Sequence, residues 1–233
     1  MQSKASFAVT VLNRIMPLSA AVSNPAGAQG LVEEVVGLPG GDLRVLRPGD
    51  SESLLTDEAF DHEELRPYWA ELWSSSLALA RILAVRPLAA VRTLELGCGL
   101  GLAAIAAARS GARVTATDWS APAIELTARN ATANGVELEA LRCSWQSPEP
   151  LVARAPWQLV LASDVLYDRA NIDLLLDLLQ RLTDARAEVL ITDPGRPPAE
   201  EFLERANEQW RVESRSVPGT PAVSLHRLSV RAP

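Results

Sequence analysis

A glycine-rich turn between an apolar strand and an alanine-rich helix constrains the fold of this chain more than any other feature. Residues 93–96 read Thr-Leu-Glu-Leu and are expected to form a short buried strand, and residues 97–101 read Gly-Cys-Gly-Leu-Gly. Glycines at alternate positions let the backbone turn sharply without a Cβ in the way, so a ligand can lie against the main chain. The following helix directs its unpaired N–H groups and its positive end toward that ligand. The stretch therefore predicts a binding site for a nucleotide-type ligand.

Alternating strand and helix patterns follow this turn to the C-terminus. Strands are expected at 92–96, 113–117, 137–141, 158–162 and 188–192, with helices at 100–110, 121–134, 172–182 and 199–209. Two more strands, at 211–217 and 223–230, are separated by a Pro-Gly-Thr-Pro turn. Alternating βα units predict a parallel sheet, and two closing strands joined by a turn predict an antiparallel pair at one edge. The sequence therefore indicates one α/β domain with a seven-stranded, mostly parallel sheet.

The first ninety residues divide into a leader and a small extension of the core. Residues 1–31 contain no acidic side chain, and only Lys4 and Arg14 are charged. We expect a disordered or loosely docked tail over residues 1–30, with an organelle transit peptide as the alternative. Short β-leaning runs at 32–36 and 43–46 predict a hairpin, and helices are expected at 57–65 and 77–83. Residues 31–90 thus form a hairpin with lid helices, and residues 91–233 form the core.

Composition excludes several classes of protein. A chain of 233 residues that is 48% hydrophobic can bury a full core. A net charge of -7 argues against nucleic-acid binding, which needs a basic face, and no apolar run is long enough to span a membrane. The two cysteines, Cys98 and Cys143, make no disulfide framework, so we expect a reducing, cytoplasmic location. His62 and His226 have no metal-ligand neighbours in the sequence, so no metal site is expected.

The spacing of the glycines bears on which ligand fits the turn. The dinucleotide-binding fingerprint needs glycine at its first, third and sixth positions, and Leu102 occupies the sixth position counted from Gly97. A nicotinamide or flavin cofactor is therefore disfavoured. Asp118 closes the next strand, where a carboxylate can accept hydrogen bonds from both hydroxyls of a ribose. Alternatively, Asp118 or Ser120 caps the following helix.

The sequence Glu-Leu-Gly-Cys-Gly-Leu-Gly at 95–101 resembles motif I of the class I, seven-β-strand methyltransferases, which use S-adenosylmethionine. The element order from about residue 77 to residue 230 is also similar to that family. The resemblance implies a Rossmann-like, doubly wound sheet with an antiparallel C-terminal strand. It also implies that Glu95 receives the ammonium group of the ligand, that Asp118 binds the ribose, and that Trp119 lies on the adenine. Ser144 and Trp145 follow the third strand, where the family places adenine contacts, although Trp145 is equally suited to the core. The residues expected at the cofactor are Trp73, Glu95, Gly97, Cys98, Gly99, Gly101, Asp118, Trp119, Ser144, Trp145 and Ser163.

Three further stretches resemble the methyltransferase-16-like group, which consists largely of protein lysine methyltransferases. Pro-Tyr-Trp-Ala-Glu-Leu-Trp at 67–73 resembles the segment before motif I and implies that Trp73 lies near the cofactor; the alternative is a hydrophobic clamp on the sheet edge. Ser-Asp-Val-Leu-Tyr-Asp at 163–168 resembles the Asp/Glu-x-x-Tyr/Phe signature of the group. Thr-Asp-Pro-Gly-Arg-Pro at 192–197 resembles a segment of the electron-transfer-flavoprotein β-subunit lysine methyltransferases.

This resemblance implies that Asp164 and Tyr167 are the catalytic residues beside the methyl acceptor. In an open α/β sheet the ligand crevice lies beyond the carboxyl ends of the strands, where Asp164 falls. Because a carboxylate raises the pKa of a nearby amine, Asp164 is expected to orient the acceptor amine, and Tyr167 to wall its slot. Alternatively, Asp164 or Asp168 caps the next helix. Arg196 is expected to contact an acidic partner or to pair with Asp193.

These observations lead to one main hypothesis and two alternatives. We expect an enzyme that transfers methyl groups from S-adenosylmethionine to a lysine side chain of a protein substrate. A small-molecule N-, O- or C-methyltransferase of the same fold is the first alternative. The second is a catalytically silent subunit that binds S-adenosylmethionine, because the glycine turn and Asp118 would serve a binder equally well.

Overall fold

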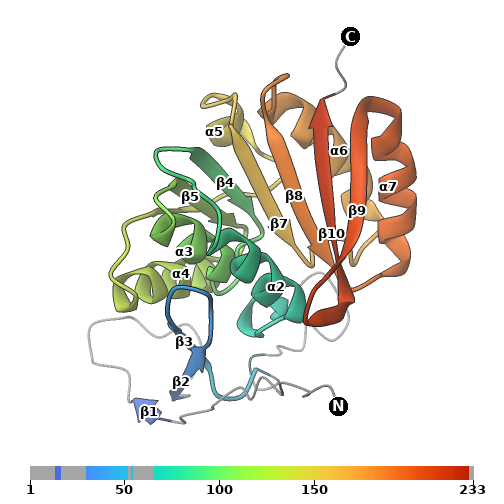
Figure 1. Cartoon of the computed structure of the whole chain (residues 1–233). Coiled ribbons are helices and arrows are strands. Elements are labelled where there is room, and N and C mark those ends of the chain that lie inside the picture. Colours follow the sequence, from blue (N-terminus) through green and yellow to red (C-terminus); the bar gives the residue numbers. More distant parts are fainter. Residues whose placement is uncertain (1–13, 17–29, 52–53, 55–65, 231–233) are drawn as a thin grey trace, which may run out of the picture.

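The apolar runs of the core pair with one another and form one large sheet (Figure 1). The computed structural model describes residues 14–16, 30–51, 54 and 66–230. The order of the seven strands in the sheet is β6-β5-β4-β7-β8-β10-β9. Their bounds are β4 (Arg92–Leu96), β5 (Arg113–Asp118), β6 (Glu139–Arg142), β7 (Leu159–Ser163), β8 (Glu188–Asp193), β9 (Trp210–Val217) and β10 (Thr220–Val230).

The pairing of the strands confirms the predicted fold. β4 lies at the centre and pairs in parallel with β5 on one side and β7 on the other. The C-terminal strand β10 runs antiparallel to both of its neighbours, β8 and β9. The sheet is therefore Rossmann-like, doubly wound and mostly parallel, as expected. Because the chain moves outward from β4 in both directions, a ligand crevice is expected at the carboxyl ends of the central strands.

Helices cover both faces of the sheet and bury two separate cores. The helices are η3 (Tyr68–Ala70), α2 (Ser74–Leu83), α3 (Leu102–Arg109), α4 (Ala121–Ala133), α5 (Glu149–Val152), α6 (Ala170–Leu182) and α7 (Pro197–Gln209). Side chains alternate between the faces of a strand. In β7, Leu159 and Leu161 therefore join the core beneath α2, α3 and α4, whereas Val160 and Ala162 join the core beneath α5, α6 and α7.

The N-terminal extension contains the predicted hairpin. Strands β2 (Leu31–Val36) and β3 (Leu43–Pro48) pair antiparallel, and β1 (Arg14–Met16) pairs with β2 from within the predicted leader. The helix expected over 57–65 lies outside the described residues. Two short elements, η3 and α5, were not predicted, because a single helical turn carries little periodic signal. Strand β6 starts at Glu139 instead of residue 137, since its pairing with β5 begins there.

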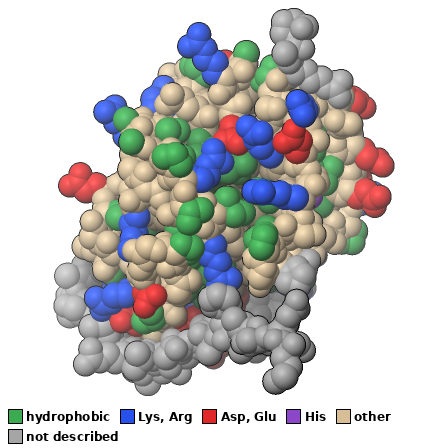
Figure 2. All heavy atoms as spheres, viewed as in Figure 1, with side chains coloured by type: hydrophobic (Ala, Val, Ile, Leu, Met, Phe, Trp, Pro, Cys, Tyr) green, Lys and Arg blue, Asp and Glu red, His purple; other side chains and the backbone are tan. Residues whose placement is uncertain are grey.

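Acidic and basic side chains lie among one another on the face shown in Figure 2. Glu188, at the start of β8, pairs through its carboxylate with Arg86 and with Arg227, both at 2.5 Å. Among the described residues, no helix is long and apolar enough to cross a membrane.

Candidate active site

A cavity of about 710 Å³ lies at the carboxyl ends of the central strands. The loops after β4, β5, β6, β7 and β8 all contribute to its wall, and η3 with the start of α2 closes one side. The volume falls within the range of about 300–1,000 Å³ that is typical of sites for small molecules and cofactors. The crevice that the strand order predicts is therefore present, and most of the sequence-predicted site residues line it.

The glycine turn adopts a backbone conformation that other residues rarely tolerate. Gly97, Gly99 and Gly101 have φ angles of +68°, +51° and +81°, all in the left-handed region. A Cβ at Gly99 would lie 3.2 Å from the carbonyl oxygen of Trp69, and a Cβ at Gly101 would lie 2.8 Å from Thr127 Cγ2. Gly97, Cys98 and Gly99 line the cavity, whereas Gly101 lies outside its wall and begins α3. The turn thus exposes main chain to the cavity, as predicted.

Asp118 lies at the end of β5 and lines the cavity beside the glycine turn. Its carboxylate accepts hydrogen bonds from the N–H of Gly99 at 3.0 Å and the N–H of Ser120 at 2.9 Å. Burial raises the pKa of Asp118, and hydrogen bonds from the backbone oppose that shift. The cap of α4 is Ser120, whose Oγ accepts a hydrogen bond from the N–H of Ala123. The capping alternative is therefore correct for Ser120 but not for Asp118.

Glu95 lies beneath the glycine turn and does not line the cavity. Side chains alternate along β4, and Glu95 faces α3, where its Oε2 accepts a hydrogen bond from the N–H of Ala104 at 2.8 Å. Its other oxygen is buried without a hydrogen-bond partner. Burial raises the pKa of Glu95 to about 8, so the side chain is mostly protonated at neutral pH. Glu95 thus supports the start of α3, and its expected contact with the ligand's ammonium group stays a prediction.

The remaining predicted cofactor residues also line the cavity. These residues are Trp73, Trp119, Ser144, Trp145 and Ser163. Trp119 is 44% exposed, so the aromatic wall on this side faces solvent in part. Arg142 and Cys143 also line the cavity and were not predicted to do so. The Nε of Arg142 donates to the carbonyl oxygen of Trp119 at 2.9 Å, a pairing between strands that no local motif indicates.

The candidate acceptor end is formed around Asp164, directly after β7. Asp164 has a φ angle of +59°, is only 8% exposed, and lines the cavity. A left-handed conformation is uncommon for a residue other than glycine and often marks a functional position. Its Oδ1 accepts a hydrogen bond from the Nε of Arg196 at 2.5 Å. Asp168, in contrast, accepts a hydrogen bond from the N–H of Ala170, the first residue of α6, whose N-cap residue is Arg169.

Arg196 links three parts of the acceptor end. Its backbone N–H and that of Gly195 donate to Asp193 Oδ1 at 2.8 Å and 2.7 Å, and this fixes the loop after β8. Its guanidinium pairs with Asp164 and lies over the ring of Trp73, at 5.6 Å from the centroid. From the sequence, Arg196 was expected to contact an acidic partner or to pair with Asp193. The pairing of its side chain with Asp164, 32 residues earlier in the chain, was missed.

Aromatic side chains from two separate segments wall the same end of the cavity. The ring centroids of Tyr68 and Tyr167 lie 5.3 Å apart, and those of Tyr68 and Trp73 lie 6.2 Å apart. Trp73 Nε1 donates to the carbonyl oxygen of Tyr68 at 2.7 Å, which holds the segment before α2 in place. Burial raises the pKa of the Tyr167 hydroxyl, so Tyr167 stays protonated at neutral pH. Tyr68 was not singled out, although the aromatic run at 67–73 was its signal.

Solved structures of methyltransferases share this fold. One is the 16S rRNA N2 G1207 methyltransferase of T. thermophilus in complex with AdoMet and guanosine, with a TM-score of 0.60 and 15% sequence identity. The match covers 85% of this chain and 50% of that one. The architecture is thus that of the class I methyltransferases, as the resemblance of the glycine turn implied. At this level of identity the likeness shows the fold alone.

The sequence profile of the lysine methyltransferase family matches residues 63–209. The chain belongs to the lysine methyltransferase family, which confirms the resemblance found in the sequence. It is 40% identical over 136 residues to the electron transfer flavoprotein beta subunit lysine methyltransferase of Xenopus laevis, covering 56% of this chain and 53% of that protein. It is 28% identical over 152 residues to the protein N-lysine methyltransferase METTL21A of Danio rerio, covering 62% and 69%. The chain spans about half the length of the flavoprotein-subunit methyltransferases that it matches.

Proposed function

We propose that this protein transfers methyl groups from S-adenosylmethionine to a lysine side chain of a protein substrate. The observation that carries the proposal is a single cavity with two chemically different ends. Exposed main chain and Asp118 form one end, and the Asp164–Arg196 pair with three aromatic rings forms the other. Membership of the lysine methyltransferase family supports the assignment of the second end to an amine.

The residues at the first end fit S-adenosylmethionine, which supplies an electrophilic methyl group on a sulfonium when bound. The fit rests on a turn in which glycine φ angles leave the main chain bare and a carboxylate lies 3.0 Å from the backbone nitrogen of Gly99. A carboxylate offers about four acceptor sites, so Asp118 retains capacity for ribose hydroxyls beside its backbone contacts. The N-terminus of α3 adds the positive end of the helix dipole near the turn.

The second end fits a lysine amine that must lose its proton before it can act as a nucleophile. The free amine has a pKa of about 10.4, which a carboxylate raises and a dry apolar wall lowers. Because Arg196 pairs with Asp164, the pair carries little net charge. Asp164 can then accept a hydrogen bond from the amine without strongly favouring its protonated form. The rings of Tyr68, Trp73 and Tyr167 flank the slot and exclude water. The slot also positions the amine for in-line attack on the methyl group, and this positioning supplies the rest of the rate acceleration.

The β subunit of an electron transfer flavoprotein is the first substrate to test, because several similar proteins carry that substrate in their names. The purified protein would be incubated with radiolabelled S-adenosylmethionine and either this subunit or a cell lysate. Label in a protein band that yields methylated lysine on hydrolysis is expected. A lysate whose lysines have been acetylated beforehand is the matched control and should stay unlabelled. Label confined to small molecules would contradict the proposal, and cofactor binding without any transfer would indicate a silent subunit.

A further inference from the structure

Helix α4 presents a polar stripe between the glycine turn and the N-terminal hairpin. Thr127, Asn130 and Asn134 follow one another three and four residues apart, so they share one face of the helix. The Oγ1 of Thr127 donates to the carbonyl oxygen of Gly99 at 2.9 Å. The Nδ2 of Asn130 donates to the carbonyl oxygen of Leu100 at 2.9 Å. Thr127 and Asn130 are fully buried, which makes these hydrogen bonds expensive to lose.

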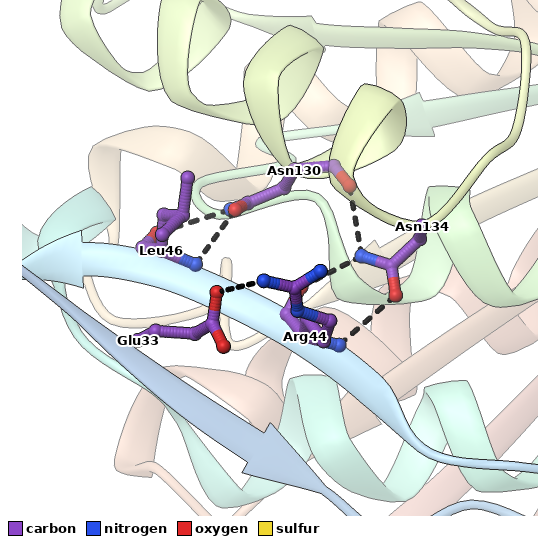
Figure 3. Close-up of polar contacts among 5 residues, drawn as sticks. All are labelled: Glu33, Arg44, Leu46, Asn130 and Asn134. Carbon is purple, nitrogen blue, oxygen red and sulfur yellow. Dashed lines mark hydrogen bonds and ion pairs between the residues drawn. The ribbon is translucent and has the colours of Figure 1, made fainter. Parts of the chain in front are cut away.

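The two asparagines also bind the edge of β3, as Figure 3 shows. Asn130 accepts from the N–H of Leu46 at 2.7 Å and donates to its carbonyl oxygen at 3.1 Å. Asn134 accepts from the N–H of Arg44 at 2.9 Å and donates to its carbonyl oxygen at 2.6 Å. A primary amide carries the same donor and acceptor as a peptide group, so the pair replaces a neighbouring strand at this edge. The hairpin is thereby held against α4.

The contacts that Asn130 and Asn134 make with β3 differ in one respect. Within the described residues, Asn130 is the side chain that hydrogen-bonds both the hairpin and the glycine turn, whereas Asn134 bonds the hairpin and its own helix. The described residues of β2 and β3 do not line the cavity. The hairpin also contacts α3 through Arg109, but Arg109 is the last residue of that helix, at the end away from the turn. The hydrogen-bonded link from the hairpin to the glycine turn therefore runs through Asn130, beside the apolar packing that Leu43 and Val45 share with Leu100 in the core.

We propose that Asn130 is a positioning residue of the glycine turn, and that through it hairpin docking and cofactor binding stabilise each other. Leu100 lies inside the turn, so fixing its carbonyl oxygen restricts the backbone that faces the ligand. A ligand that stabilises this turn also stabilises the hairpin contact, because coupling between two sites is reciprocal. The inference rests on the proposed function only for the identity of the ligand.

The test compares Asn130→Asp with Asn134→Asp in the full chain. Both substitutions keep the side-chain size and the acceptor oxygen and remove the donor to β3, but only the first also removes the donor to Leu100. Titration calorimetry with S-adenosylhomocysteine should show about tenfold weaker binding for Asn130→Asp, and a change of less than about twofold for Asn134→Asp. Circular dichroism would verify that both variants are folded.

Hydrogen exchange supplies a second measurement that needs no variant. In the wild-type protein, S-adenosylhomocysteine should slow the exchange of the β3 amides of Arg44 and Leu46 several-fold, although β3 does not line the cavity. That protection should persist in Asn134→Asp and disappear in Asn130→Asp. Wild-type binding without slower β3 exchange, or equal affinities of the two variants, would overturn this inference alone. A wild-type protein that fails to bind S-adenosylhomocysteine would overturn the proposed function as well.

Discussion

The two ends of the cavity are built by different means. At the cofactor end, the glycine turn is one continuous segment that offers main chain, and Asp118 follows on the neighbouring strand. At the acceptor end, the contacting groups are side chains from three distant segments: the run before α2, the loop after β7 and the loop after β8. The first end depends on backbone conformation, and the second depends on how three loops meet.

This difference predicts which end tolerates change. A turn with three left-handed glycines has few alternatives in sequence, because a Cβ would meet the backbone of Trp69 or the side chain of Thr127. At the acceptor end, aromatic and charged side chains can be substituted while the backbone keeps its conformation. The same fold can therefore keep its cofactor and vary its acceptor, which agrees with the general rule that function resides in sites carried by a fold. Substitutions at each end test whether cofactor binding and methyl transfer can be changed independently.

The largest effect is expected at the cofactor end, from Asp118→Asn. Loss of the charge weakens the hydrogen bonds that ribose hydroxyls would donate, and bonds to charged groups contribute about 1.5–3 kcal/mol each. We expect the dissociation constant for S-adenosylhomocysteine, measured by calorimetry, to rise about 100-fold. Asp168→Asn is the matched control, since Asp168 lines the acceptor end and accepts a hydrogen bond from the first residue of α6, and its effect should stay below about twofold. An unchanged affinity of Asp118→Asn for S-adenosylhomocysteine would show that Asp118 does not bind the ribose.

At the acceptor end, Asp164→Asn should reduce turnover without affecting the cofactor. The substitution preserves shape but removes the charge that pairs with Arg196 and the carboxylate that would orient the amine. We expect kcat/KM for methyl transfer to fall about 30-fold, or about 2 kcal/mol, with an affinity for S-adenosylhomocysteine within about twofold of wild type. If cofactor affinity fell as far as turnover, the two ends would not be separable.

A smaller effect, with a distinctive pH dependence, is expected for Arg196→Gln. Without the guanidinium, Asp164 raises the pKa of the acceptor amine, so less of the amine is neutral at a given pH. The rising limb of kcat/KM against pH should move up by about one unit, which lowers the rate about tenfold at neutral pH. Arg196→Lys keeps the charge but not the planar contact with Trp73, and it should restore most of the profile. A uniform loss at every pH would indicate a structural role only.

The smallest effect on binding is expected for Glu95→Gln, because Glu95 lies beneath the turn. The affinity for S-adenosylhomocysteine should change less than about threefold. Stability should respond to pH instead, since burial raises the pKa of Glu95 to about 8 in the folded protein. The unfolded chain releases this proton near pH 4.3, so the wild-type protein loses stability as pH rises from about 4.3 to about 8, and the loss levels off above that.

Glu95→Gln mimics the protonated side chain and keeps an acceptor for the N–H of Ala104. It should therefore stabilise the protein relative to wild type by about 3 kcal/mol more at pH 8.5 than at pH 5.5. Denaturant unfolding at the two pH values measures this difference. A constant difference between the two proteins at both pH values would show that Glu95 does not titrate in this range.

The sequence by itself determined the sheet, the glycine turn and the position of Asp118. These features arise from local rules: alternating apolar runs form strands, and glycine is required where φ is positive. The carboxyl ends of parallel strands meet at one edge of the sheet. Residues at those ends could therefore be predicted from the sequence to line one cavity. Asp164 was located in this way, and Trp73 and Tyr167 were located by the family resemblance, although the partners of all three were not.

Only the tertiary structure decided which side chains meet. The guanidinium of Arg196 pairs with Asp164, whereas only its backbone N–H bonds Asp193, because the loops after β7 and β8 lie side by side. Glu95 faces α3 because its neighbours in β4, Leu94 and Leu96, pack into the core on the other face of the sheet. Asn130 joins the hairpin to the glycine turn across 84 and 30 residues of sequence. Contacts of this range depend on packing between elements, and a local pattern carries no information about them.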